Sequence, residues 1–252
     1  MGAQIDLNAD IGERFGHWHL GDDVDAELMA LITSANLAAG FHAGDPSIID
    51  ASLVLAQRHG VAVGVHPGFG DLVGFGRRHI DASAAELVND VLYQLGAVAA
   101  LAARRGLALH HLKLHGALFM HAARDQPFAE LLVEALLQAA PGLPLYCLPD
   151  SALTRAARTG GVEVVREFYA DRDYSCDGSI VFVRRVPRLD PEAVADKVLT
   201  ACTEGVVTSV DGKRVEVEFE SICLHSDTPG ALEIARAIHR RLTAAGFRLA
   251  AG

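Results

Sequence analysis

Short apolar segments alternate along the chain with longer segments whose apolar residues recur every three or four positions. The short segments have the length and composition of buried strands, and the longer ones have the periodicity of amphipathic helices. This alternation predicts parallel strands joined by right-handed helical crossovers. The expected strands are residues 4–8, a segment beginning at residue 34, and residues 61–65, 109–114, 143–148, 162–168 and 221–224.

Several of the expected helices carry explicit start and stop signals. Ser83 and Glu86 form a capping-box pattern, and Gly106 ends the same segment. Pro46 occupies a first-turn position that tolerates proline, and Gly60 ends that segment. The expected helices span residues 25–32, 47–59, 83–105, 127–140, 151–159, 190–203 and 229–245.

One segment interrupts the alternation of strands and helices. In residues 206–219, two runs with period-two alternation flank Asp211-Gly212, a pair typical of tight hairpin turns. We interpret this segment as a β-hairpin inserted beside the main sheet. No low-complexity linker divides the chain, so we expect residues 1–252 to form a single β/α barrel domain.

The composition is that of a globular protein. Of the 252 residues, 50% are hydrophobic and 21% are charged, which excludes a disordered chain. The formal net charge is −10, so we expect no basic surface and no nucleic-acid partner. The sequence has no run of about 18 apolar residues, so we expect no membrane-spanning helix.

The cysteines and the first residues indicate a reducing compartment. The four cysteines form no CxxC pair, and we expect them to be reduced, mostly buried thiols. The first ten residues carry neither a basic segment nor a long apolar stretch. We therefore expect no signal peptide and a cytoplasmic location.

Polar residues follow almost every expected strand at its C-terminal end. In α/β folds the ligand crevice lies outside the carboxyl ends of the strands. In a barrel these ends converge on one mouth, so residues far apart in sequence would meet there. The residues concerned are Asp6, Asn8, Asp10, Glu13, Asn36, His42, His66, Lys113, His115, Glu167, Arg172, His225 and Asp227.

Four histidines lie just after four different strands: His42, His66, His115 and His225. They could bind a divalent metal through neutral imidazoles, with carboxylates completing the shell. They could equally act as general acids and bases near neutral pH, or be ordinary core and loop residues. The sequence has no HExxH helix motif, so it gives no firm prediction of a metal site.

Cationic side chains occur in three of these segments. Lys113 shares a strand face with His115, and we expect it to point into the pocket as a charge for phosphate or carboxylate. Arg77 and Arg78 end a glycine-rich segment and could bind an anion bidentately, or form a surface pair. Arg172 lies between two aspartates that could simply neutralise it.

Eight short segments occur in order along the chain. They are DLNADIGE (6–13), SANLAAGFHAGDP (34–46), GVHP (64–67), GFGRR (74–78), YQ (93–94), HGAL (115–118), EFYADR (167–172) and CLH (223–225). In this combination the chain resembles the LamB/YcsF family over about residues 6–246. It departs from the family pattern at Leu114, where a proline is usual, and at Ser226, where a glycine is usual. Both departures leave the charged candidates in place.

The resemblance implies an irregular seven-stranded β/α barrel of the glycoside hydrolase/deacetylase type. It also implies that the chain acts as the first of three components, A, B and C, of an ATP-dependent 5-oxoprolinase. This enzyme cleaves 5-oxoproline (pyroglutamate) to glutamate with hydrolysis of ATP. The implied partners are subunits B and C, and the implied cofactor is ATP with Mg²⁺. The ATP site could lie on this chain, on a partner or between them.

Opening a stable lactam in this way needs an anion clamp, a cation near the developing charge and a base for water. We expect catalytic roles for Asp10, Glu13, His42, His66, Lys113, His115 and Asp227. We expect substrate or phosphate binding by Asp6, Asn8, Asn36, Arg77, Arg78, Glu167, Arg172 and His225. The alternatives are a metal-dependent hydrolase or deacetylase that acts on a carbohydrate without ATP, and a non-catalytic protein that only binds substrate within the complex.

Overall fold

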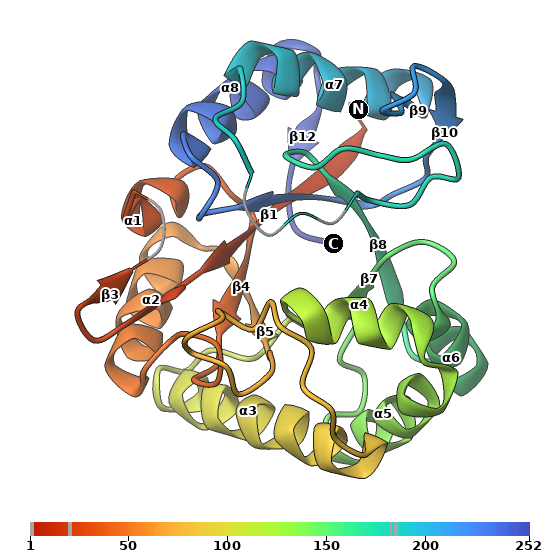
Figure 1. Ribbon diagram of the computed structural model, residues 1–252. Coiled ribbons are helices and arrows are strands. Elements are labelled where there is room, and N and C mark those ends of the chain that lie inside the picture. The colour runs from red at the N-terminus through yellow and green to blue at the C-terminus, as the bar shows by residue number, and fades with distance from the viewer. Residues whose placement is uncertain (1–2, 20–21, 182, 184–185) are drawn as a thin grey trace.

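The computed structural model describes residues 3–19, 22–181, 183 and 186–252. Within these ranges seven parallel strands lie in the order β11-β8-β7-β6-β5-β4-β1, and β11 also pairs with β1, which closes a barrel (Figure 1). The fold confirms the expected irregular seven-stranded β/α barrel. Its strands are β1 (Gln4–Ile11), β4 (Ser34–Ala38), β5 (Ala62–His66), β6 (His111–Leu112), β7 (Leu145–Cys147), β8 (Val164–Tyr169) and β11 (Ser221–His225).

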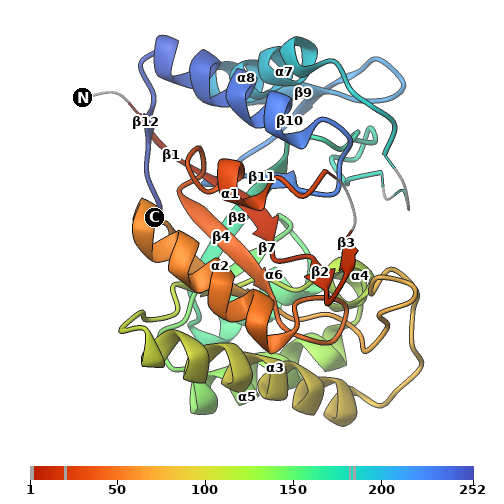
Figure 2. The ribbon, with the colours of Figure 1, turned by 90° about the vertical axis from the view of Figure 1, so that its left-hand side faces the viewer.

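Helices cover the outside of the barrel. Figure 2 shows α7 and α8 together on one side and α2, α3 and α5 on the opposite side. The expected Ser83–Glu86 capping box is present, and Gly60 ends its helix in the left-handed conformation. The described helices are α1 (Asp25–Leu28), α2 (Pro46–His59), α3 (Ala84–Arg104), α4 (Gly116–Arg124), α5 (Gln126–Ala139), α6 (Ala152–Gly160), α7 (Pro191–Glu204) and α8 (Ala231–Ala244).

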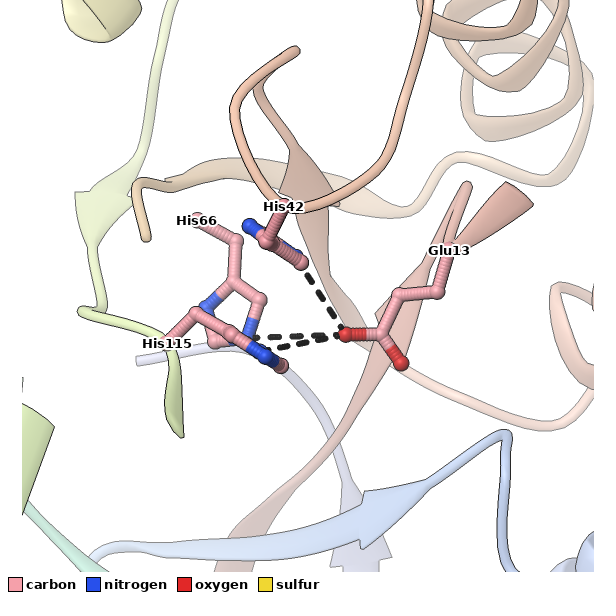
Figure 3. A group of neighbouring side chains, drawn as sticks. All are labelled: Glu13, His42, His66 and His115. Carbon is pink, nitrogen blue, oxygen red and sulfur yellow. Dashed lines mark hydrogen bonds and ion pairs between the residues drawn. The ribbon is translucent and has the colours of Figure 1, made fainter. Parts of the chain in front are cut away.

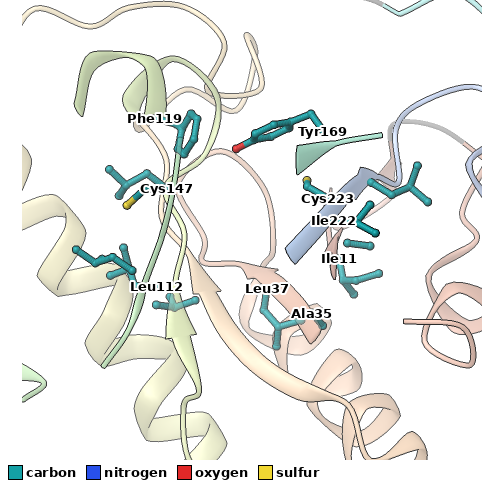
Figure 4. Packing of buried hydrophobic residues seen from close by; sticks show 14 of the residues in the cluster. Ile11, Ala35, Leu37, Leu112, Phe119, Cys147, Tyr169, Ile222 and Cys223 are labelled. Atoms are coloured by element: carbon teal, nitrogen blue, oxygen red, sulfur yellow. The ribbon is translucent and has the colours of Figure 1, made fainter. Parts of the chain in front are cut away.

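The apolar core lies between the strands and the helices. On β1, Leu7, Ala9 and Ile11 are fully buried in it. Ile222 of β11 and Leu112 of β6 belong to the same core, and Figure 4 labels both together with Ile11. Because side chains alternate along a strand, the intervening residues of β1 face the other way, into the barrel. These are the polar residues Asp6, Asn8 and Asp10, all buried. The interior of the barrel is therefore polar, and its hydrophobic stabilisation comes from the outer layer.

The inserted hairpin is present, with antiparallel strands β9 (Val206–Thr208) and β10 (Arg214–Glu216). Three elements lie outside the expected pattern: helix α4, the small hairpin of β2 (Arg14–Phe15) and β3 (Trp18–His19), and β12 (Arg248–Leu249), which pairs with the start of β1. No side chain caps the start of α4, so the sequence carries no start signal for it.

Two expected elements are shorter than their apolar patterns. The strand expected over residues 109–114 is regular only at His111–Leu112, where it pairs with β7 through a single residue pair. The helix expected over residues 25–32 is regular only as α1. Within the described ranges, no helix is both long enough and apolar enough to cross a membrane.

Candidate active site

The carboxyl ends of the strands meet at one mouth, and most of the polar residues expected there are present. Lys113 follows β6 and reaches across the barrel to β1, β8 and β11. Its Nζ atom lies 2.9 Å from Asp10 Oδ1, 3.3 Å from Glu167 Oε1 and 2.8 Å from Cys223 Sγ. The Lys113 side chain is 3% exposed. This ammonium group therefore joins carboxylates from two strands inside the barrel.

Opposite charges control the ionisation of this network. Burial alone raises the pKa of Asp10, but His66 and Lys113 hold that pKa well below its usual range. Burial alone lowers the pKa of Lys113, but Asp10, Cys223 and Glu167 hold it well above its usual value. The pair is therefore ionised at neutral pH, which suits Lys113 to stabilising an anion.

Three histidines and one carboxylate form a compact group beside this network (Figure 3). Glu13 Oε1 lies 3.2 Å from His115 Nδ1, 3.5 Å from His42 Nε2 and 4.0 Å from His66 Nε2. The two facing nitrogens His66 Nε2 and His115 Nδ1 are 3.0 Å apart. The group comes from the ends of β1, β4, β5 and β6. We refer to Glu13, His42, His66 and His115 as the histidine–glutamate cluster.

Backbone carbonyl groups fix two of these rings. His66 Nδ1 lies 2.8 Å from the carbonyl oxygen of Lys113, and His115 Nε2 lies 2.8 Å from that of Phe75. A carbonyl oxygen can only accept, so both of these ring nitrogens carry the proton. The other nitrogen of each ring points at the cluster. Asp10 Oδ2 is a further neighbour, 3.2 Å from His66 Nε2.

His42 is stacked on His115, with ring centroids 3.7 Å apart. Its side chain is fully buried, and burial lowers the pKa of its imidazole to about 3. Two glycines allow this close packing. A Cβ atom at Gly68 would lie 2.6 Å from His42 Nδ1, and one at Gly76, where φ is +60°, would lie 2.8 Å from His115 Cδ2. His42 is thus a neutral imidazole held against the cluster.

A second histidine–carboxylate pair lies across the mouth. His225 Nδ1 lies 2.9 Å from Asp171 Oδ1, and Arg172 Nη1 lies 2.9 Å from the other oxygen of Asp171. Thr228 also donates a hydrogen bond to Asp171. Burial alone raises the pKa of Asp171, but His225 and Arg172 lower it overall. His225 is thus oriented by Asp171 and lies outside the histidine–glutamate cluster, and its Nε2 faces Asp10 Oδ2 across 3.7 Å.

The rim of the mouth carries an arginine–aspartate pair. Arg77 Nη1 lies 2.8 Å from Asp227 Oδ2, and both side chains are 12% exposed. Together with Lys113 and Arg172, Arg77 lines a narrow cavity that opens to solvent. His66, His115, His225 and Asp10 also line it. The cavity therefore presents cations, imidazoles and a carboxylate to one small ligand.

Residues at the centre of the barrel form hydrogen bonds to the residues of the site. Asn36 Nδ2 donates to Asn8 Oδ1 and Asp10 Oδ1, over 2.7 and 2.8 Å, and Asn8 Nδ2 donates to Glu167 Oε1 over 3.0 Å. None of Asn8, Asn36 and Glu167 lines the cavity. Their hydrogen bonds position the groups that do.

Two expected binding residues lie away from the cavity. Asp6 accepts hydrogen bonds from Thr33, Ser34, Tyr146 and Ser221 deeper in the barrel. These hydroxyl groups already satisfy the buried carboxylate, so its surroundings are structural. The Arg78 side chain is 55% exposed and pairs with Asp71 within its own loop.

Three residues of the site were not identified by looking for polar residues at strand ends. Cys223 and Tyr169 face the barrel interior, where Cys223 contacts Lys113 and Tyr169 donates a hydrogen bond to Glu167 over 2.8 Å. An apolar or aromatic residue in a strand looks like core in the sequence. His111, which lies 2.6 Å from Asn36 Oδ1, could have been found because it alternates with Lys113 and His115.

The model of the LamB/YcsF family matches residues 5–252 of this chain. The chain belongs to the LamB/YcsF family. Among curated relatives of this family member, a 5-oxoprolinase A-type subunit of Pseudomonas aeruginosa is 58% identical over 249 residues, with 99% of each chain covered. The 5-oxoprolinase A-type subunit of a Thermus thermophilus strain is 45% identical over 251 residues, covering 98% of this chain and 99% of the relative.

Solved structures agree with the family assignment. The lactam utilization protein from Thermus thermophilus superposes with a TM-score of 0.91 at 43% identity, covering 99% of this chain and 100% of that one. A putative cellobiose-phosphate cleavage protein from Enterococcus faecalis, at 11% identity and a TM-score of 0.56, covers 99% of this chain and 97% of that one. The second similarity concerns the fold alone.

Proposed function

We propose that this LamB/YcsF family member is the A-type subunit of a cytoplasmic 5-oxoprolinase that opens the lactam ring of 5-oxoproline to give glutamate. The Pseudomonas aeruginosa 5-oxoprolinase A-type subunit matches 99% of this chain at 58% identity. The observation that carries the proposal is the cavity that brings Lys113, Arg77, Arg172 and the imidazoles of His66 and His115 together.

These residues suit hydrolysis of a small cyclic amide. In the assembled complex, ATP phosphorylates the amide oxygen of the lactam and is released as ADP. Water then adds to the carbonyl carbon, the C–N bond breaks and the ring nitrogen takes a proton. A second water releases phosphate from the carbonyl carbon, so the products are one amine, one carboxylate, ADP and phosphate. Lys113, held charged between Asp10 and Glu167, stabilises the oxyanion as it forms. Asp10 and His225, which line the same cavity, accept and return the proton of water.

The carboxylate of the substrate needs a cation at the rim of the cavity. Arg77 is suited to it because its guanidinium group lies at the rim and can bind a carboxylate bidentately. Asp227 orients that guanidinium group in the free protein. We therefore assign Arg77 to substrate binding and Asp227 to positioning Arg77.

Arg77→Gln is expected to raise KM for 5-oxoproline about 10–100-fold, because a charge-assisted hydrogen bond contributes about 1.5–3 kcal/mol. The value of kcat should change less than KM. Steady-state kinetics of glutamate formation by the assembled enzyme measure both. Arg104→Gln, at an exposed position at the end of α3, is the control and should leave KM unchanged. A fall in kcat at constant KM would contradict a binding role.

The residues of this cavity do not fit a nucleoside triphosphate. Each cation at the mouth already faces a carboxylate: Lys113 faces Asp10, Arg172 faces Asp171, and Arg77 faces Asp227. A triphosphate, with several negative charges, would meet all three carboxylates at close range, whereas the single carboxylate of 5-oxoproline meets only Asp227. We propose that subunits B and C bind ATP with Mg²⁺ and consume it in the assembled complex.

An exposed apolar surface beside the cavity is suited to contact with a partner subunit. Apolar side chains stand exposed beside the histidine–glutamate cluster, on the β2–β3 hairpin and on a loop after β5: Phe15 is 37%, Trp18 69%, Leu72 40% and Val73 81% exposed. Glu13 and His42 lie in the same depression as these side chains. Apolar surface next to a catalytic cavity supports contact with a partner protein there.

The test is glutamate release from 5-oxoproline, with and without ATP, by this chain alone and by its mixture with subunits B and C. We expect release only in the mixture that contains ATP, with one ADP formed per glutamate. Release by the chain alone without ATP would overturn the proposed dependence on partners. No release by a folded, assembled complex in any mixture would overturn the function itself.

A further inference from the structure

The histidine–glutamate cluster contains more hydrogen-bond acceptors than donors. The proton of His66 is on Nδ1 and that of His115 is on Nε2, since both of these atoms face backbone carbonyl oxygens. In the neutral rings, His66 Nε2 and His115 Nδ1 are therefore lone pairs, and they face each other across 3.0 Å. Two lone pairs at this distance repel each other unless a cation lies between them.

The carboxylates around the cluster add to this excess. Glu13 Oε1 lies 3.2 Å from His115 Nδ1, and Asp10 Oδ2 lies 3.2 Å from His66 Nε2. Both oxygens of Glu13 and both ring nitrogens of His42 are buried without a hydrogen-bond partner among the described residues. Buried polar atoms normally have such a partner. Four of the six such atoms among the described residues therefore belong to this cluster; the other two are Arg14 Nε and Asp227 Oδ1.

The formal charge of the cluster and its neighbours is negative, which also favours a bound cation. Asp10, Glu13, Glu167 and Asp171 give four negative charges, and Lys113 and Arg172 give two positive charges. With neutral histidines the sum is −4 + 2 = −2. A cation bound in the cluster would offset this negative charge.

The distances within the cluster match those around a metal ion. Zinc binds histidine nitrogen at about 2.0–2.1 Å, so tetrahedral ligand atoms lie about 3.3 Å apart. The two facing nitrogens, His66 Nε2 and His115 Nδ1, are 3.0 Å apart. Glu13 Oε1 lies 3.2, 3.5 and 4.0 Å from the nearest nitrogens of His115, His42 and His66, respectively. All four ligand atoms lie within 4.8 Å of one another. Ring N–H groups bonded to backbone carbonyls are also the usual outer support of metal-binding histidines.

We propose that Glu13, His42, His66 and His115 form a binding site for one divalent transition-metal ion, with zinc as the reference ion. Imidazole nitrogens with one carboxylate suit zinc, and also manganese, iron or cobalt. Magnesium is disfavoured because it prefers oxygen ligands. The site exists independently of ATP, which carries its own magnesium.

The role of this ion rests on the proposed lactam opening. Bound to such an ion, a water molecule has a pKa near 7, so it supplies hydroxide at neutral pH. Held by Glu13, His42, His66 and His115, the ion would supply the hydroxide that adds to the carbonyl carbon of the phosphorylated lactam. The electron pair of the C–N bond would go to the ring nitrogen, which would take the proton released from that water. No atom changes its oxidation state overall.

The test measures metal binding without substrate, ATP or partner proteins. The full chain is stripped with a chelator, and ZnCl₂ is added in a calorimetric titration, with elemental analysis of the dialysed protein. We expect one zinc ion per chain and a Kd below about 1 µM. Glu13→Gln and His115→Ala should each weaken binding at least about 100-fold, since even outer-shell partners change affinity about 10–100-fold.

The controls separate this site from surface binding. His59→Ala, at an exposed position at the end of α2, should bind zinc as the unchanged protein does. Circular dichroism checks that each variant is folded, and the absorption of bound Co²⁺ in the unchanged protein reports tetrahedral coordination without any variant. Absence of stoichiometric zinc in the folded, unchanged protein, or zinc binding that Glu13→Gln leaves intact, would overturn the metal site.

Metal binding by the chain, combined with glutamate release by the assembled complex, distinguishes the two proposals. A chain that binds one zinc ion, in a complex that forms no glutamate, would keep the metal site and reject the proposed function. A complex that forms glutamate at full rate from a chain that binds no metal would keep the proposed function and reject the metal site.

Discussion

Asp10→Asn is expected to lower the rate of glutamate formation by the assembled enzyme about 10²–10⁴-fold, the range for losing a group that moves a proton in the transition state. Asp10 lies between Lys113 and the histidine–glutamate cluster. Its Oδ1 contacts Lys113 Nζ at 2.9 Å, and its Oδ2 faces His66 Nε2 at 3.2 Å. The change removes its negative charge and its ability to accept a proton.

The fold should survive this substitution because asparagine has the same shape. Its oxygen can still accept hydrogen bonds from Lys113 and Asn36. Turnover is measured as glutamate released per minute, and folding by thermal melting. Asp50→Asn, a carboxylate on the surface of α2 that pairs with Arg105, is the control. Less than a tenfold loss in Asp10→Asn would exclude Asp10 from the chemical step.

Lys113→Met is expected to affect both stability and activity, with the largest effect on stability of the changes considered. Removing one partner of a buried ion pair costs about 3–5 kcal/mol, since it leaves an uncompensated charge. For a chain of this size each kcal/mol lowers Tm by about 2–4 °C. A fall in Tm of roughly 6–20 °C is therefore expected, together with loss of measurable turnover at permissive temperature.

Two further variants identify the cause of this effect. Lys213→Met removes an exposed partner of Asp211 and should change stability by less than about 1 kcal/mol. Adding Glu167→Gln to Lys113→Met removes one of the unpaired carboxylates and should recover part of the lost stability. Stability equal to or above that of the unchanged protein in Lys113→Met alone would contradict the buried-charge explanation.

The barrel strands could be predicted because their signals are local. The side chains that face the helices form a short apolar pattern in each strand, as Val63 and Val65 do in β5, and the hairpin turn is specified by Asp211-Gly212. The two-residue strands β2, β3 and β12 are too short for any periodicity, and β12 exists only because β1 offers it an edge.

The candidate site could be predicted in part, for the same reason. Asp10, His66 and Lys113 were expected at the mouth because they follow strands, and the structure places them in contact with one another. The sequence could not show which histidines would form a group. His42 reaches the cluster through a loop whose packing needs Gly68 and Gly76, whereas His225 is oriented by Asp171. Those pairings depend on the closed barrel.

The pairing of β1 with β11 has a consequence for how this chain folds. Asp6 pairs with Ser221, more than two hundred residues later, so the closing contact has a very high sequence separation. Such contacts form slowly because the loop entropy is lost before the contact stabilises the chain. During synthesis β1 emerges first and keeps an unpaired edge until β11 follows, and unpaired edges promote aggregation. Production of this chain should therefore depend on chaperones that shield β1 until the last strand arrives.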